Sequence, residues 1–157
     1  MKQTNLKNKV TAINIHLRDL QGLHPDVQGF VAATSDLIYA AAPDDFSESS
    51  LCYLLELHPI QVTRLNANFY VVGGFRSYEL AMLRMKQDFI VPCCLRSELS
   101  NCEIRQIALT DILGSPLMCS LGPKFVQQIQ NLVSRLDEDV SVLCPRLASL
   151  RRIRGKK

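Results

Sequence analysis

Two adjacent glycines, followed closely by an arginine and a serine, are the residues of this sequence best suited to chemistry. The stretch FYVVGGFRSYELAML, residues 69–83, places Gly73 and Gly74 just before Arg76 and Ser77. Glycines let the backbone bend sharply and approach a ligand, and a helix N-terminus adds partial positive charge. Arginine can donate two parallel hydrogen bonds to phosphate oxygens, and serine can donate its hydroxyl hydrogen. The stretch therefore predicts a phosphate-binding turn.

The same residues also have a purely structural interpretation. The glycine pair can simply form a tight turn, and Arg76 can pair with Glu79 or Asp88 on the surface. A glycine pair before a helix is a weak signal by itself. The spacing alone leaves both interpretations open.

The candidate turn needs a strand before it and a helix after it. Residues 69–72 are aromatic and β-branched, which predicts a buried strand, and the apolar spacing after Arg76 predicts a helix. Residues 60–72 predict a β-hairpin that turns at 66–68, and residues 89–95 predict a further strand. The turn is thus expected at the end of a hairpin that feeds a helix.

The rest of the pattern predicts more helices than strands. We expect a strand over 10–17, a turn over 22–26, and helices over 30–42, 44–58, 101–113 and 125–136. Ser47 or Asp45 can cap the second of these helices. The predicted fold class is α+β, with a small mixed sheet and helices packed around it.

Composition favours one domain over residues 1–157. The chain has 47% hydrophobic and 21% charged residues, enough to bury a core. No apolar run reaches the length of a membrane span, and the start lacks the apolar centre of a secretory signal. None of the six cysteines forms a C-x-x-C pair, which favours free thiols over zinc or disulfides. We therefore expect a cytoplasmic protein.

The positive charge is concentrated at the end of the sequence. Residues 144–157 carry six basic groups and no acid, whereas the remaining 143 residues carry 12 basic and 15 acidic groups. Such a tail attracts nucleic-acid phosphates or an anionic membrane surface, but it can also serve solubility or bind a protein. The candidate nucleic-acid contacts are Arg151, Arg152, Arg154, Lys156 and Lys157.

The order of motifs resembles the ParB-like N-terminal domain of the ParB/sulfiredoxin superfamily. LHPIQV at 57–62 stands where the family has a segment before the hairpin, and Pro59, Ile60 and Val62 match. GFRS at 74–77 aligns with the family's Gly-x-Arg-Arg turn, and Val91-Pro92 with the strand after the following helix. The resemblance covers residues 51–96.

Membership of this family would imply nucleotide binding. In the family the glycine turn binds nucleotide phosphates, which ParB proteins use as a CTP-dependent switch and sulfiredoxins use in ATP chemistry. The resemblance therefore implies Gly73, Gly74, Arg76 and Ser77 as phosphate ligands and ATP or CTP as cofactor, with Mg²⁺. Short stand-alone members occur on plasmids and other mobile elements, some as nucleases or ATPases and some as inhibitors of conjugative DNA transfer.

Several departures limit what the resemblance implies. Sulfiredoxins place a nucleophilic cysteine where this chain has Phe75, so sulfiredoxin chemistry is not expected. The second arginine of the turn is Ser77, and the later Glu-Asn-x-x-Arg motif is reduced to Thr110 and Asp111 with no following arginine. Asp111 remains the candidate Mg²⁺ ligand, although it can equally be a surface group, and Glu103 is a substitute.

Two classes of function follow. In the first, the protein hydrolyses a nucleotide or cuts DNA, with Arg76, Asp111 and Glu103 as catalytic candidates and the basic tail holding DNA nonspecifically. In the second, the fold persists without chemistry and binds or inhibits a protein partner. The intact Gly-Gly-x-Arg favours the first class, and the altered second motif favours the second.

Overall fold

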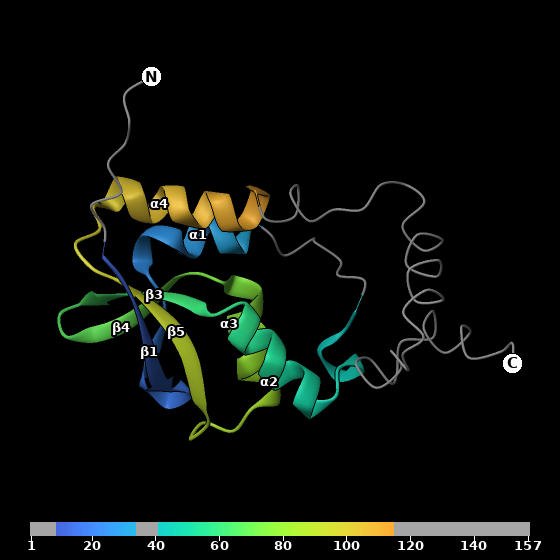
Figure 1. The fold of residues 1–157 in the computed structure, drawn as a ribbon. Helices are drawn as coiled ribbons and strands as arrows, with labels where there is room; N and C mark the ends of the chain where they lie inside the picture. Colours follow the sequence, from blue (N-terminus) through green and yellow to red (C-terminus); the bar gives the residue numbers. More distant parts are fainter. Residues whose placement is uncertain (1–8, 34–40, 115–157) are drawn as a thin grey trace, which may run out of the picture.

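A mixed five-stranded sheet organises residues 9–33 and 41–114, the part of the chain described by the computed structural model (Figure 1). The strand order is β1-β5-β3-β4-β2. β1 and β5 are antiparallel, β5 and β3 parallel, β3 and β4 antiparallel, and β4 and β2 parallel. The strands are β1 (Val10–His16), β2 (Leu20–Leu23), β3 (Ile60–Leu65), β4 (Asn68–Gly73) and β5 (Ile90–Arg96). The α+β prediction with a mixed sheet is confirmed.

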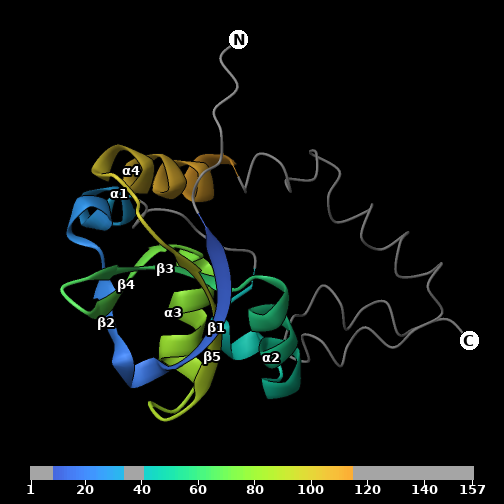
Figure 2. The same ribbon diagram turned by 60° about the vertical axis from the view of Figure 1, so that its left-hand side comes forward.

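Helices cover both faces of this sheet. α2 (Glu48–Leu57) and α3 (Phe75–Arg84) pack on one face, whereas α1 (Gln28–Ala32) and α4 (Asn101–Leu109) lie together on the other (Figures 1 and 2). Short turns of 3-10 helix, η1 (Leu17–Asp19), η2 (Pro25–Val27) and η3 (Pro43–Asp45), join the elements. A π-helical turn, η4 (Thr110–Gly114), continues α4. The sheet is thus the middle layer of three.

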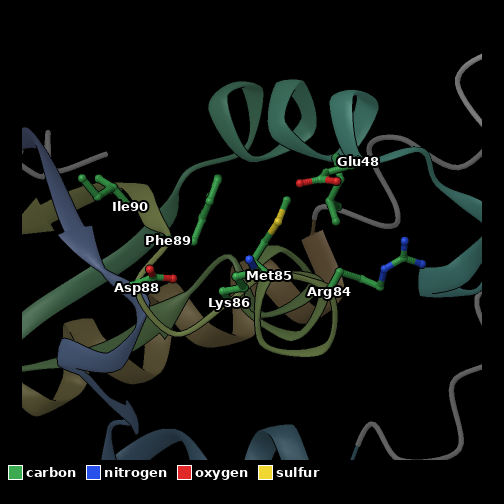
Figure 3. A pocket seen from close by; sticks show the side chains of 8 residues that line it. Glu48, Arg84, Met85, Lys86, Asp88, Phe89 and Ile90 are labelled. Carbon is green, nitrogen blue, oxygen red and sulfur yellow. The ribbon is translucent and has the colours of Figure 1, made fainter.

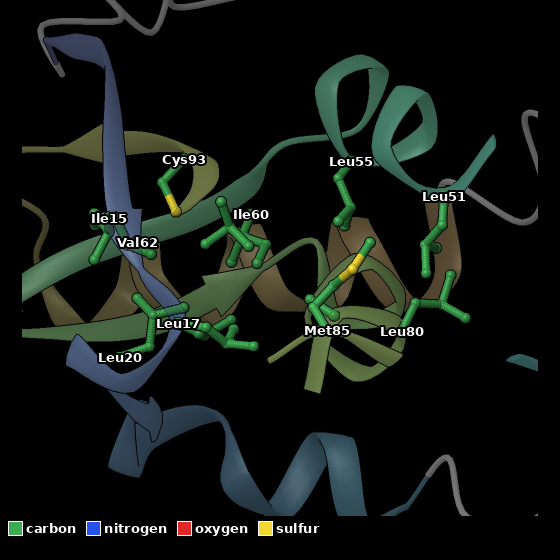
Figure 4. Packing of buried hydrophobic residues seen from close by; sticks show 13 residues of the cluster. Ile15, Leu17, Leu20, Leu51, Leu55, Ile60, Val62, Leu80, Met85 and Cys93 are labelled. Carbon is green, nitrogen blue, oxygen red and sulfur yellow. The ribbon is translucent and has the colours of Figure 1, made fainter. Parts of the chain in front are cut away.

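The core has a large cluster on the α2 and α3 side and a small one under α4. Figure 4 shows the large cluster, in which leucines of α2 and α3 meet side chains of β1, β3 and β5. Alternation in the strands selects the face, because Val62 and Val71 enter the large cluster whereas Val72 enters the small one. The small cluster is Val27, Val72, Ile104 and Ala108. Both clusters meet around the end of β4, where the candidate turn begins.

Local signals explain the elements next to the turn. The Ser47 hydroxyl accepts a hydrogen bond from the Ser50 N–H at 3.2 Å, so Ser47 caps α2 as predicted. The hairpin at 60–72 is confirmed as β3 and β4, joined by a tight turn in which Asn66 and Ala67 have positive φ. The strand predicted over 89–95 is β5.

Two of the sequence predictions before residue 43 differ from the structure in their bounds. Of the helix predicted over 30–42, residues 30–32 belong to α1, and Ala42 is not helical but extended (φ −76°, ψ 158°) because a residue before proline avoids the helical region. The turn predicted over 22–26 begins instead within β2, where β4 supplies a pairing partner that the sequence pattern does not reveal. Residues 34–40 and the helix predicted over 125–136 lie outside the described residues.

Candidate functional site

The glycine turn joins β4 to α3, and Gly74 is its left-handed residue. Gly74 has φ 68° and ψ 35°, a conformation that residues with a side chain rarely adopt. A Cβ atom at this position would lie 3.1 Å from the Ile60 Cα atom and 3.1 Å from the Pro59 carbonyl oxygen. Both conformation and space therefore require glycine here, and the turn passes directly over the start of β3.

Gly73 meets a different element, because it packs under α4. A Cβ atom on Gly73 would lie 3.3 Å from the Ile107 Cγ2 atom and 3.3 Å from the Gln61 Cγ atom. These are tighter than ordinary packing distances, so the missing side chain lets α4 cross close to the end of β4. This crossing carries the end of α4 toward the N-terminus of α3.

Asp111 occupies the N-terminus of α3. The Phe75 N–H donates a hydrogen bond to the Asp111 Oδ2 atom at 3.0 Å. Asp111 lies in the π-helical turn η4, which directs its carboxylate toward a helix on the opposite face of the sheet. A carboxylate is favourable there because the first N–H groups of a helix lack partners within it and carry partial positive charge. The structure thus brings Asp111 to the candidate turn.

Arg76 donates hydrogen bonds within the protein. Its Nη1 atom donates to the Glu79 Oε2 atom at 2.7 Å, and its Nη2 atom donates to the Ala41 carbonyl oxygen at 2.9 Å. Pairing of Arg76 with Glu79 was one of the two pairings named in the purely structural interpretation of the sequence. The Arg76 side chain remains 26% exposed, so a ligand can still reach it.

Ser77 faces inward. Its hydroxyl donates to the His58 carbonyl oxygen at 2.7 Å, which joins α3 to the residue that follows α2. Ser77 is buried, unlike Arg76. Its hydroxyl hydrogen is therefore used within the fold.

Glu103 does not lie at the turn. It forms a capping box with Ser100 at the start of α4, where the Ser100 N–H and hydroxyl both donate to the Glu103 Oε2 atom, at 2.9 and 2.7 Å. Eight residues of helix, about 12 Å, separate this end of α4 from Asp111. The structure brings Gly73, Gly74 and Asp111 together but leaves Glu103 apart.

Metal binding at the turn is limited by the small number of ligands that the protein supplies there. No group of three or more His, Cys, Asp or Glu side chains comes together within 9–33 and 41–114. Mg²⁺ commonly uses one or two carboxylates together with substrate phosphates and water. Asp111 therefore fits Mg²⁺ only as a shared ligand with a bound phosphate.

Cys93 of β5 is a poor candidate for a nucleophile. Cys93 is buried, and its burial, with a smaller contribution from Cys94, raises the pKa of the Cys93 thiol to about 12. A thiol of this pKa is almost entirely protonated at neutral pH and reacts slowly. This agrees with the prediction that residues 93 and 94 lie on a core strand.

A hollow of about 600 Å³ lies at the other end of α3 (Figure 3). It opens between the start of α2 and the loop from α3 to β5, and Arg84 in its wall donates to the Asp44 Oδ1 atom at 2.6 Å. Its lining mixes charged and apolar side chains, namely Glu48, Leu51, Arg84, Met85, Lys86, Asp88, Phe89 and Ile90. The ten residues of α3, about 15 Å of helix, separate it from the glycine turn, so it is no part of that site. No sequence motif marks this hollow.

The basic residues of the tail, Arg151 to Lys157, lie outside the described residues. Comparison of the chain with protein-family models and with curated proteins found no match. Within the two described segments, no helix is both long and apolar enough to cross a membrane.

Proposed function

We propose that the protein binds the phosphate groups of a nucleotide at the glycine turn, in exchange for the carboxylate of Asp111. The observation that carries the proposal is the 3.0 Å hydrogen bond from the Phe75 N–H to the Asp111 Oδ2 atom. An anionic oxygen is already accommodated at the start of α3, where the helix dipole favours negative charge. A phosphate oxygen has the same charge and the same need for N–H donors.

The exchange would use groups that lie next to one another. Phosphate would take the Phe75 N–H from Asp111, and Arg76 would turn from Glu79 to the phosphate, since it is the partly exposed cation of the first helical turn. The released Asp111 carboxylate would then lie beside the phosphate, where the two can share Mg²⁺. Hydrolysis of the nucleotide or of DNA is a further step that the family resemblance implies, with Arg76 and Asp111 as its candidate residues.

A second candidate function is a protein-interaction or inhibitor module without chemistry. The donors of the turn favour it, because Phe75, Arg76 and Ser77 each donate to a group of the protein itself. In this case the turn only joins the layers of the fold. The altered Glu-Asn-x-x-Arg motif agrees with this alternative.

Wider parts of the proposal rest on sequence alone. ParB/sulfiredoxin membership and a plasmid or conjugation context rest on the resemblance over residues 51–96. Nonspecific DNA binding rests on the charge of residues 144–157, and the cytoplasmic location rests on cysteine usage.

Nucleotide titration tests the first candidate. The purified protein is titrated with ATP, CTP and slowly hydrolysed analogues, with and without Mg²⁺, beside Arg76→Ala and Asp111→Asn variants. Arg84→Ala is the matched control, because Arg84 ends the same helix, is also 26% exposed and also pairs with a carboxylate. We expect Arg76→Ala to weaken binding by about 1.5–3 kcal/mol, the scale of a charged hydrogen bond, and Arg84→Ala to leave it unchanged.

The Asp111 variant separates its two roles. If Asp111 only competes with phosphate, Asp111→Asn strengthens binding with and without Mg²⁺, since a neutral amide then replaces the competing carboxylate. If it also holds Mg²⁺, the variant weakens binding only when Mg²⁺ is present. Absence of nucleotide binding by the parent and by Asp111→Asn would contradict the proposal and favour the interaction module.

A further inference from the structure

The outer edge of β1 is the longest regular strand edge that the described residues leave unpaired. β1 and β2 end the sheet on its two sides. β2 has four residues, pairs with β4 in a shifted register and contains Gly22 at φ 94°, so its edge is short and irregular. β1 pairs with β5 through all seven of its residues without a bulge (Figure 2).

The hydrogen bonds at its two ends fix which way the β1 backbone faces. The Leu17 N–H donates to the Phe89 carbonyl oxygen at 2.9 Å, and the Ser97 N–H donates to the Lys9 carbonyl oxygen at 3.3 Å. Residues of an antiparallel strand alternate in direction, so odd-numbered residues from 9 to 17 face β5. The N–H and C=O groups of Val10, Ala12, Asn14 and His16 therefore point away from the sheet.

β1 lacks the features that usually protect an edge strand. Its sequence, VTAINIH, contains no proline, lysine or acidic residue, and its pairing has no bulge. Natural edge strands are commonly kept from pairing by such charges, prolines, bulges or short length. An uncharged, regular edge with outward backbone groups is a template for another strand.

We propose that β1 pairs antiparallel with β1 of a second copy of this chain, which joins two sheets into one across a two-fold axis. A second copy fits because the strand is self-complementary. The register that pairs all seven residues places Ile13 opposite Ile13 of the copy and Ala12 opposite Asn14 of the copy. Thr11, Ile13 and Ile15 share the face of the large core cluster, so the cores of the two copies would continue into each other.

The uncharged strand also favours a copy over a charged peptide. Self-pairing of β1 brings no like charges together, and it offers no charge that would select a basic or acidic partner strand. Ala12 and Asn14 are exposed, so substitutions there leave the described core unchanged. These two positions are the best places to test the pairing.

Charge placed at these positions gives a matched pair of variants. In the double variant Ala12→Lys with Asn14→Lys, the lysine at position 12 of each copy lies opposite the lysine at position 14 of the other copy. In Ala12→Lys with Asn14→Asp, each lysine faces an aspartate instead. Sedimentation equilibrium of the full chain should show a dimer for the parent, a dissociation constant raised by about tenfold or more for the lysine pair, and a restored dimer for the lysine–aspartate pair.

Amide hydrogen exchange locates the interface independently. Residues 10, 12, 14 and 16 should exchange slowly at high protein concentration and fast after dilution, whereas residues 11, 13 and 15 should stay protected at both concentrations. A parent that remains monomeric at high concentration would overturn the proposal. So would a dimer that the two variants affect equally, or one in which the exchange of residues 10, 12, 14 and 16 does not change with dilution.

Discussion

The start of α3 and the outer edge of β1 both offer backbone polar groups, but the protein treats them differently. At the start of α3, the Asp111 carboxylate accepts a hydrogen bond from the Phe75 N–H. At β1 the groups of alternate residues point away from the sheet. A ligand at the first place must displace a protein group, whereas a strand at the second gains hydrogen bonds without such competition. The comparison predicts a switchable site in one region and an association surface in the other.

The largest effect on the free energy of unfolding should come from Gly74→Ala, which places a side chain in the turn itself. The left-handed conformation costs about 1–3 kcal/mol for a residue with a side chain, and the 3.1 Å contacts with Ile60 and Pro59 add to it. Chemical denaturation should show a corresponding loss of unfolding free energy. Gly29→Ala is the control, because a Cβ there meets nothing within 4 Å and its φ is not positive. Equal stability of both variants would contradict the geometry of the turn.

Proline at neighbouring positions of β1 should next separate its two sides. The Thr11 N–H faces β5, so Thr11→Pro removes a bond of the sheet and should cost about 1–3 kcal/mol of unfolding free energy. Ala12→Pro removes only an outward N–H and should change the stability of the monomer little. Both residues are exposed, so the difference reports backbone direction. Denaturation at low protein concentration measures it, and a reversed order would show that the assigned direction is wrong.

A smaller effect is expected from Asp111→Ala. Removal of a side chain that accepts from the first turn of a helix usually costs about 1 kcal/mol of unfolding free energy. Asp111→Asn keeps an acceptor oxygen, so it should cost less. Denaturation of the two variants side by side measures the difference. If neither variant changes stability, Asp111 is no cap of α3, and the two regions do not differ in this way.

Local sequence signals were enough to predict the elements around the turn. The hairpin follows from two β-rich runs with a short turn, and α2 follows from Ser47 before an apolar periodic stretch. The glycine pair correctly predicts a strand-to-helix turn, because only glycine adopts the Gly74 conformation without strain. These features depend on residues close together in the sequence.

The features that local sequence patterns do not predict depend on residues that lie far apart in the chain. Asp111 was a candidate residue, but its contact with Phe75 requires α4 to cross the end of β4, which no local pattern encodes. The Arg76 contact with Glu79 lies within one helical turn and could be expected, whereas its contact with Ala41 could not. β2 was missed because its pairing with β4 outweighs a sequence that resembles a turn.

The pairing of β1 with β5 also determines when the sheet can be completed. Residues 10–16 are synthesised before their partners, residues 90–96, so β1 cannot pair with β5 until the hairpin and α3 between them have been synthesised. Closing so long a loop slows folding. During that wait β1 is an uncharged strand without a partner, and the nascent chain is most exposed to exchanging it with a neighbouring molecule. Chaperone dependence during synthesis should therefore centre on the first strand.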